Sequence, residues 1–102
     1  MITKTVEEGD LKVTVSQANG IMGNKRRRLG YEQSQIEDTD QDSRITRIID
    51  YPNLVACSDI RPDFDTFAAM PDAFLARWAE AVYELNPHWH WSAGASEKKV
   101  KT

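Results

Sequence analysis

The sequence has a single cysteine, no long apolar run, no internal repeat and no linker rich in proline or serine. The one cysteine, Cys57, excludes a disulfide within the chain and a zinc site made of several cysteines, and it is typical of a reducing compartment. The longest apolar stretch is far shorter than the roughly 20 residues that cross a bilayer. The first ten residues, MITKTVEEGD, lack the apolar region of a signal peptide. We therefore expect a soluble intracellular protein with no membrane segment.

An excess of basic residues is also missing. The 102 residues include 13 Lys and Arg against 16 Asp and Glu, which gives a net charge of −3. This balance argues against a dedicated nucleic-acid binder, which usually carries a basic surface. Hydrophobic residues make up 40% of the chain and charged residues 28%, as in ordinary globular domains. The length allows one packed core, so we predict a single domain over residues 1–91 and a flexible polar tail over residues 92–102.

The N-terminal part shows the alternation of a half-buried strand. Apolar and polar residues alternate over residues 11–16, LKVTVS, and this period of two is typical of a strand with one buried face. Gly9 and Asp10 can form the turn of a hairpin whose other strand covers residues 3–7. The rest of the chain has helical spacing. The predicted fold class is therefore mainly α, loosely α+β: a small helical domain with a short N-terminal β-strand or hairpin.

The first helix is predicted over about residues 17–32, with Ser16 or Asn19 as its N-terminal cap. Three glycines weaken it, because each costs up to ~1 kcal/mol relative to alanine in a helix. This helix therefore needs tertiary contacts to persist. The narrow apolar stripe of this helix is formed by Ile21, Met22, Lys25 with Arg26, and Leu29.

A second helix is predicted to start near Asp42 and Ser43, which are good capping residues. Pro52 interrupts it, because proline lacks the amide hydrogen of a helical hydrogen bond. We expect a kink there, or a restart that Asp50 caps. The predicted apolar face consists of Ile45, Ile48, Ile49, Leu54 and Val55.

The second half begins with a short helical turn over residues 63–70, in which Phe64 and Phe67 are expected to face inward. Pro71 then opens the strongest predicted helix, residues 71–85, since proline is well tolerated in a first helical turn. The apolar stripe of this helix is formed by Phe74, Leu75, Trp78, Val82 and Leu85.

Four consecutive basic residues, Lys25, Arg26, Arg27 and Arg28, form a candidate contact for nucleic acid or another anionic partner. Four successive helical positions span about 400°, so these side chains cannot share one face of the helix. So few charges would bind nucleic acid weakly and without sequence specificity. The alternative interpretation is the solvated side of a marginal helix.

No arrangement of residues indicates catalysis. Cys57 lies among apolar residues, where a free cysteine is usually a small buried hydrophobe rather than a nucleophile. His88 and His90 could hold zinc only with further ligands, because zinc sites use three or four protein side chains. No carboxylate pair has a spacing that suggests acid–base work, and no glycine-rich phosphate loop is present. The sequence therefore predicts a protein that is not an enzyme, with no catalytic residues, no cofactor and no metal site.

Two stretches of the second half carry a recognisable pattern. Residues 47–56 read RIIDYPNLVA and residues 78–89 read WAEAVYELNPHW, and they follow the strand LKVTVSQA and the helix GIMGNKRRRLGYEQ. Over residues 11–91 this order of segments resembles the tail assembly chaperones of long-tailed (siphovirus-like) bacteriophages and prophages. The most telling pieces are the YP after an apolar helical turn and the segment VYELNPHW, which are structural rather than catalytic.

The resemblance implies a non-enzymatic protein that binds the phage tape-measure protein, a long and largely helical chain, and keeps it soluble while the tail assembles. It places the protein in the host bacterial cytoplasm, absent from the mature virion, and we expect a homo-oligomer. In many phages a longer form of the chaperone arises by ribosomal frameshifting. Residues 97–99, Glu-Lys-Lys, fit the A-rich stretch where such a frameshift occurs.

A groove for amphipathic helical segments would use aromatic side chains and flexible methionines, which allow varied fits. For Phe64 the alternative is a place in the core, and for Tyr83, Trp89 and Trp91 the alternatives are a partner or oligomer contact and a place against the core. Two other functions stay open: a small nucleic-acid-associated or regulatory phage protein that uses the basic block, and a virion protein such as a head–tail connector or tail-completion factor. The candidate partner-binding residues are Met22, Phe64, Met70, Tyr83, Trp89 and Trp91.

Overall fold

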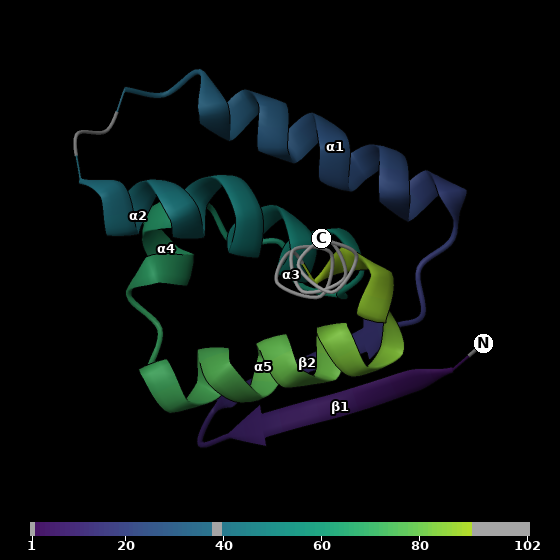
Figure 1. Cartoon of the computed structure of the whole chain (residues 1–102). Helices are drawn as coiled ribbons and strands as arrows, with labels where there is room; N and C mark the ends of the chain where they lie inside the picture. Colours follow the sequence, from purple (N-terminus) through teal and green to yellow (C-terminus); the bar gives the residue numbers. More distant parts are fainter. Residues whose placement is uncertain (1, 38–39, 91–102) are drawn as a thin grey trace, which may run out of the picture.

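The structure of the chain is a computed structural model that describes residues 2–37 and 40–90 (Figure 1). The predicted tail over residues 92–102 and the candidate Trp91 lie outside the described residues. The mainly helical fold with an N-terminal hairpin agrees with the fold class expected from the sequence. In chain order the elements are β1 (Thr3–Glu8), β2 (Leu11–Ser16), α1 (Gly20–Ser34), α2 (Gln41–Ile45), η1 (Thr46–Asp50), α3 (Tyr51–Ala56), α4 (Phe64–Ala68), α5 (Asp72–Leu85) and η2 (Pro87–Trp89).

The predicted hairpin is confirmed. Strands β1 and β2 pair antiparallel, in a register that runs from Thr3 opposite Ser16 to Glu8 opposite Leu11. The turn between them uses Gly9 with a φ of 59°, a left-handed conformation that glycine adopts without steric cost. One face of the hairpin packs on α5 and buries its valines, whereas the other face is exposed (Figure 1).

Helix α1 is capped by Asn19, whose Oδ1 accepts a hydrogen bond of 3.0 Å from the Met22 amide. The helix packs on η1 and α3, and Met22 and Leu29 lie against the core. The prediction that Ile21 shares this stripe is wrong, because Ile21 is 79% exposed and is not among the residues of α1 that pack against the core. Helix α1 therefore has apolar side chains on two faces.

The second predicted helix is continuous from Gln41 to Ala56, but its middle segment η1 is a π-helix. Just before Pro52, the Tyr51 amide donates to the carbonyl of Thr46, five residues back instead of four. The wider turn changes the register of the helix, and Ile45 is left 50% exposed. The predicted face is therefore buried only in its α3 part, because Ile45 is exposed and Ile48 and Ile49 are half-buried.

The expected restart of this helix, with Asp50 as its cap, is also wrong. Asp50 has helical backbone angles and caps nothing, because the helix passes through this position without a break. Its carboxylate instead accepts a hydrogen bond of 3.2 Å from the Tyr83 hydroxyl. The short helix α4 does have the expected cap, since the Asp63 carboxylate accepts from the Thr66 amide at 2.8 Å.

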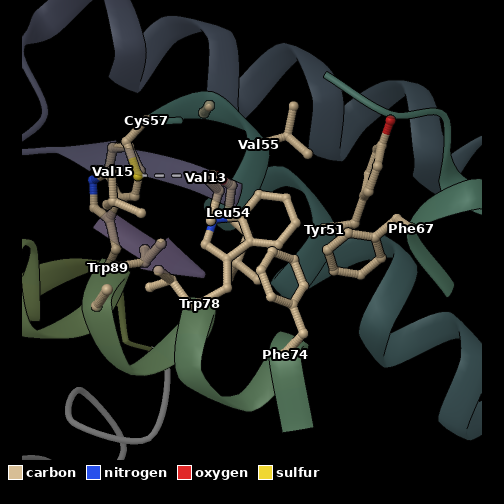
Figure 2. Close-up of a cluster of buried hydrophobic side chains, with 14 of the residues drawn as sticks. Val13, Val15, Tyr51, Leu54, Val55, Cys57, Phe67, Phe74, Trp78 and Trp89 are labelled. Atoms are coloured by element: carbon tan, nitrogen blue, oxygen red, sulfur yellow. Dashed lines mark hydrogen bonds between the residues drawn. The ribbon is translucent and has the colours of Figure 1, made fainter. Parts of the chain in front are cut away.

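The core lies between α5, the hairpin, α3 and α4 (Figure 2). Trp78 is fully buried at its centre, and its ring lies 5.5 Å from that of Phe67 and 5.8 Å from that of Phe74. The indole Nε1–H of Trp78 donates to Ser58 Oγ at 2.8 Å, so its one polar group is satisfied. The large rings of α5 and α4 are buried together with the valines of the hairpin and the aliphatic side chains of α3, and this burial stabilises the small domain.

Candidate docking surfaces

The predicted partner-binding residues do not form one groove. Phe64 and Trp89 are buried in the core cluster, with Trp89 only 6% exposed. Both side chains are therefore part of the core and are not presented to a partner at the surface. Met22, Met70 and Tyr83 are half-buried and pack against different parts of the core.

The basic block is divided between two sides of α1, as its helical spacing predicts. Arg26 points inward, with its guanidinium 4.9 Å from the ring centre of Trp89. Burial is the main cause that lowers the pKa of Arg26.

Arg27 and Arg28 are exposed, and Arg27 Nη2 donates to Asn24 Oδ1 at 2.6 Å. Lys25 is partly covered, and its pKa is lowered, mainly by burial and also by Arg61 and Arg28. The four cations therefore do not make one continuous patch.

A buried polar network ties the C-terminal segment to α3. Asn53 Nδ2 donates to the Tyr83 hydroxyl at 3.1 Å and to the Trp89 carbonyl at 3.2 Å. Asn53 Oδ1 accepts from Arg26 Nη1 at 3.4 Å. Burial raises the pKa of Asp50, which accepts from Tyr83, and burial also raises the pKa of the Tyr83 hydroxyl. Sequence reasoning missed this network, because each of its hydrogen bonds joins residues more than 25 positions apart along the chain.

Cys57 has the buried position that the sequence predicts. Its thiol donates to the Asn53 carbonyl at 3.4 Å, and burial raises its pKa to about 11. A thiol with such a pKa is almost entirely protonated at neutral pH, and the thiolate is the reactive form. Within residues 2–37 and 40–90, no group of three His, Cys, Asp or Glu side chains is placed to hold a metal ion.

A row of isoleucines on α2 and η1 lines an open hollow of about 350 Å³. Ile45, Ile48 and Ile49 supply its apolar surface, while Gln41 and Arg44 supply its polar part. Ile45 is half exposed, so the row is accessible from solvent. The spacing of these residues along the helix is that of an apolar ridge, which can pack against the ridge of another helix. We call this surface the isoleucine hollow.

Two more hollows lie beside α5. The first, of about 530 Å³, is lined mainly by Leu11, Ala69, Met70 and Pro71, and it includes the predicted partner residue Met70. The second, of about 240 Å³, lies between η1 and α5, and we call it the α5 hollow. Its lining residues are Thr46, Asp50, Leu54, Phe67, Asp72, Leu75, Ala76 and Ala79.

No family model, curated protein or solved structure matches the chain. In the part of the chain that the structure describes, no helix is both long enough and apolar enough to span a membrane. The surfaces described above are therefore the observations on which a function can be argued.

Proposed function

We propose that this chain is a protein-binding module that covers apolar helical segments of another protein, and that it acts as a tail assembly chaperone of a long-tailed phage. The partner is then the tape-measure protein. The resemblance carried by residues 47–56 and 78–89 supports the choice of partner. The isoleucine hollow is the single observation that carries the binding role.

The isoleucine hollow has the chemistry that a helical partner needs. An amphipathic helix presents apolar side chains at intervals of three and four residues, and these fit between apolar side chains with the same spacing. Ile45, Ile48 and Ile49 have that spacing and lie in an open hollow. A partner helix that covers these isoleucines removes their apolar surface from water, and this burial favours binding by roughly 25 cal/mol per Å². An open, shallow surface also accepts segments of differing sequence, as a long helical client requires.

The proposal places the protein in the host bacterial cytoplasm during tail assembly and outside the mature virion. It also includes self-association, and a longer frameshifted form in the phages that encode one. Mass spectrometry of mature particles separates the chaperone from a head–tail or tail-completion protein, which would be retained there. Gel mobility of DNA and RNA at low salt separates it from a nucleic-acid-associated protein, which would retard both.

Co-expression with a tape-measure protein from the same phage genome tests the proposal. We expect the tape-measure protein to move from the insoluble to the soluble fraction and to co-purify with this chain. The substitution Ile45→Glu places a charge on the isoleucine hollow and should abolish that effect. Ile2→Glu is a matched control, because Ile2 is also an exposed isoleucine, at 58%, but lies on the hairpin side. An insoluble tape-measure protein beside folded wild-type chain would contradict the proposal.

A further inference from the structure

The outer face of α1 carries large apolar and cationic side chains together. Ile21 is 79% exposed and Tyr31 is 68% exposed, although the inner face of α1 already packs on α3. Arg27 and Arg28 lie between them in the sequence and are also exposed. A helix that contacts a single core usually has one apolar stripe. Apolar residues on both faces of α1 therefore indicate that its outer face packs against a second surface.

The α5 hollow has the opposite charge. Its floor is formed by the buried side chains of Leu54 and Phe67, and Ala76 and Ala79 on α5 leave the space above them open. Asp50 and Asp72 supply carboxylates to its lining, whereas no lysine, arginine or histidine lines it. An apolar hollow with carboxylates fits a long cationic side chain, because the aliphatic stem can cover the alanines while the charged end meets the carboxylates.

We propose that the outer face of α1 in one copy of this chain docks in the α5 hollow of a second copy. Arg27 and Arg28 of the first copy then meet Asp50 and Asp72 of the second. Among the described residues neither arginine forms an ion pair with a carboxylate, so both are available for this contact. Arginine and tyrosine are enriched among the residues that contribute most of the binding free energy at protein interfaces, and both are present on this face.

The arrangement of the two surfaces determines the kind of assembly. Helix α1 lies on one side of the α2–η1–α3 helix and α5 lies on the other (Figure 1). The contact is therefore between two different surfaces, so each copy that uses its α1 face keeps its α5 hollow free. Such a head-to-tail contact continues from copy to copy and gives a ring or an open chain rather than a closed dimer. The inference does not depend on the tape-measure protein as partner.

Oligomeric state measured over a range of concentrations tests the inference, by light scattering after gel filtration and by sedimentation velocity. We expect wild-type protein to form species larger than a dimer. The double variant Arg27→Glu with Arg28→Glu removes the cations of the α1 face, and Ala76→Arg fills the α5 hollow with a cation. Each variant alone should be monomeric. All three changed positions are exposed, so circular dichroism should show wild-type folding.

Matched controls change the same residue types outside the two surfaces. Ala73→Arg makes the same substitution on α5 at an exposed position that does not line the hollow, and Lys12→Glu reverses an exposed cation on the hairpin. Both should assemble as wild type does. Variants and controls that assemble alike would overturn the inference.

Mixing the two monomeric variants gives the sharpest result. The α1 variant still has an intact hollow and the hollow variant still has an intact α1 face, so one productive contact remains. We expect a 1:1 dimer that grows no further. A mixture that stays monomeric, or a wild-type protein that is monomeric at every concentration, would overturn the inference. A monomeric wild type that loses tape-measure binding through Ala76→Arg would assign the hollow to that partner instead.

Discussion

The side chains of Asn53 on α3 and Tyr83 on α5 are joined by a hydrogen bond of 3.1 Å between Nδ2 and the phenol oxygen. The same amide nitrogen donates to the carbonyl of Trp89, so a single buried asparagine holds α5 and η2 against α3. A buried polar network of this kind stabilises one arrangement strongly, because each group left without a partner is costly. The position of α5, and with it the α5 hollow, depends on this contact.

Removal of the Asn53 amide should therefore destabilise the fold. Asn53→Ala leaves the Trp89 carbonyl and the Tyr83 hydroxyl short of a partner and creates a small cavity. We expect a loss of about 2–4 kcal/mol in the free energy of unfolding, measured by urea denaturation. The exposed amide of Gln17 provides the control, and Gln17→Ala should cost less than about 0.5 kcal/mol. Equal losses in the two variants would contradict the role of Asn53.

Trp78 should be the most sensitive position of the core. Its side chain is fully buried between Phe67 and Phe74, so Trp78→Ala should cost about 3–5 kcal/mol. That loss is comparable with the whole stability of a small domain, and far-UV circular dichroism should show extensive unfolding. Trp78→Phe keeps most of the ring volume and loses the hydrogen bond to Ser58, so its loss should be clearly smaller. A Trp78→Ala protein that melts like wild type would show that the ring is not part of the core.

Much of this fold is predictable from local pattern, and the exceptions have identifiable causes. The period of two in β2 and the apolar spacing of α5 are properties of short segments, and each buries the face that its sequence indicates. The exposure of Ile45 could not be predicted, because it depends on a π-helical turn whose extra residue changes which face the helix presents. Trp89 is buried, and its carbonyl accepts a hydrogen bond from Asn53 on a distant helix, a contact that no local pattern encodes.

The candidate surfaces were less accessible to sequence reasoning than the fold. A hollow forms between elements, so the α5 hollow joins residues from η1 and α5 that are separated by more than 20 positions. The division of the basic block could be predicted, because four successive helical residues point in different directions. The helical spacing also placed Arg26 on the side of Met22 and Leu29, but its contacts with Asn53 and Trp89 could not be predicted, because they depend on the tertiary fold.

Asp50 should make stability depend on pH in a defined direction. Burial raises its pKa above the value in the unfolded chain, so the folded state binds the proton more tightly. The free energy of unfolding therefore falls as the pH rises from the pKa of Asp50 in the unfolded chain through its higher pKa in the folded state. Asp50→Asn keeps an acceptor for Tyr83 without the charge. We expect the variant to be more stable than wild type at pH 7, with the difference shrinking towards pH 3 in urea titrations.

Titrating the variant and the wild type in parallel cancels the contribution of the other carboxylates. A difference that is constant with pH would assign the effect to packing rather than to charge. A variant that is less stable at pH 7 would show that the bond from Tyr83 to the ionised carboxylate outweighs its burial.

Two glycines should respond in opposite ways to alanine. Gly9 has a φ of 59° in the hairpin turn, so Gly9→Ala should lower the free energy of unfolding by about 1 kcal/mol. Gly30 lies in α1, where an added Cβ would be 3.5 Å from the Ile48 carbonyl oxygen, an ordinary contact. Gly30→Ala should raise stability by about 0.5–1 kcal/mol through helix propensity. Thermal melts of the pair test this, and a destabilised Gly30→Ala would mean that the contact between α1 and η1 does not tolerate an added methyl group.

We propose that apolar helical segments of the tape-measure protein bind in the isoleucine hollow. Calorimetric titration with soluble fragments of that protein tests this proposal most directly. We predict that at least one helical fragment binds with a negative heat-capacity change, the mark of apolar burial, and that Ile45→Glu removes the binding while Ile2→Glu leaves it unchanged. Fragments that together span the tape-measure protein and show no binding, or binding that Ile45→Glu does not weaken, would contradict the claim.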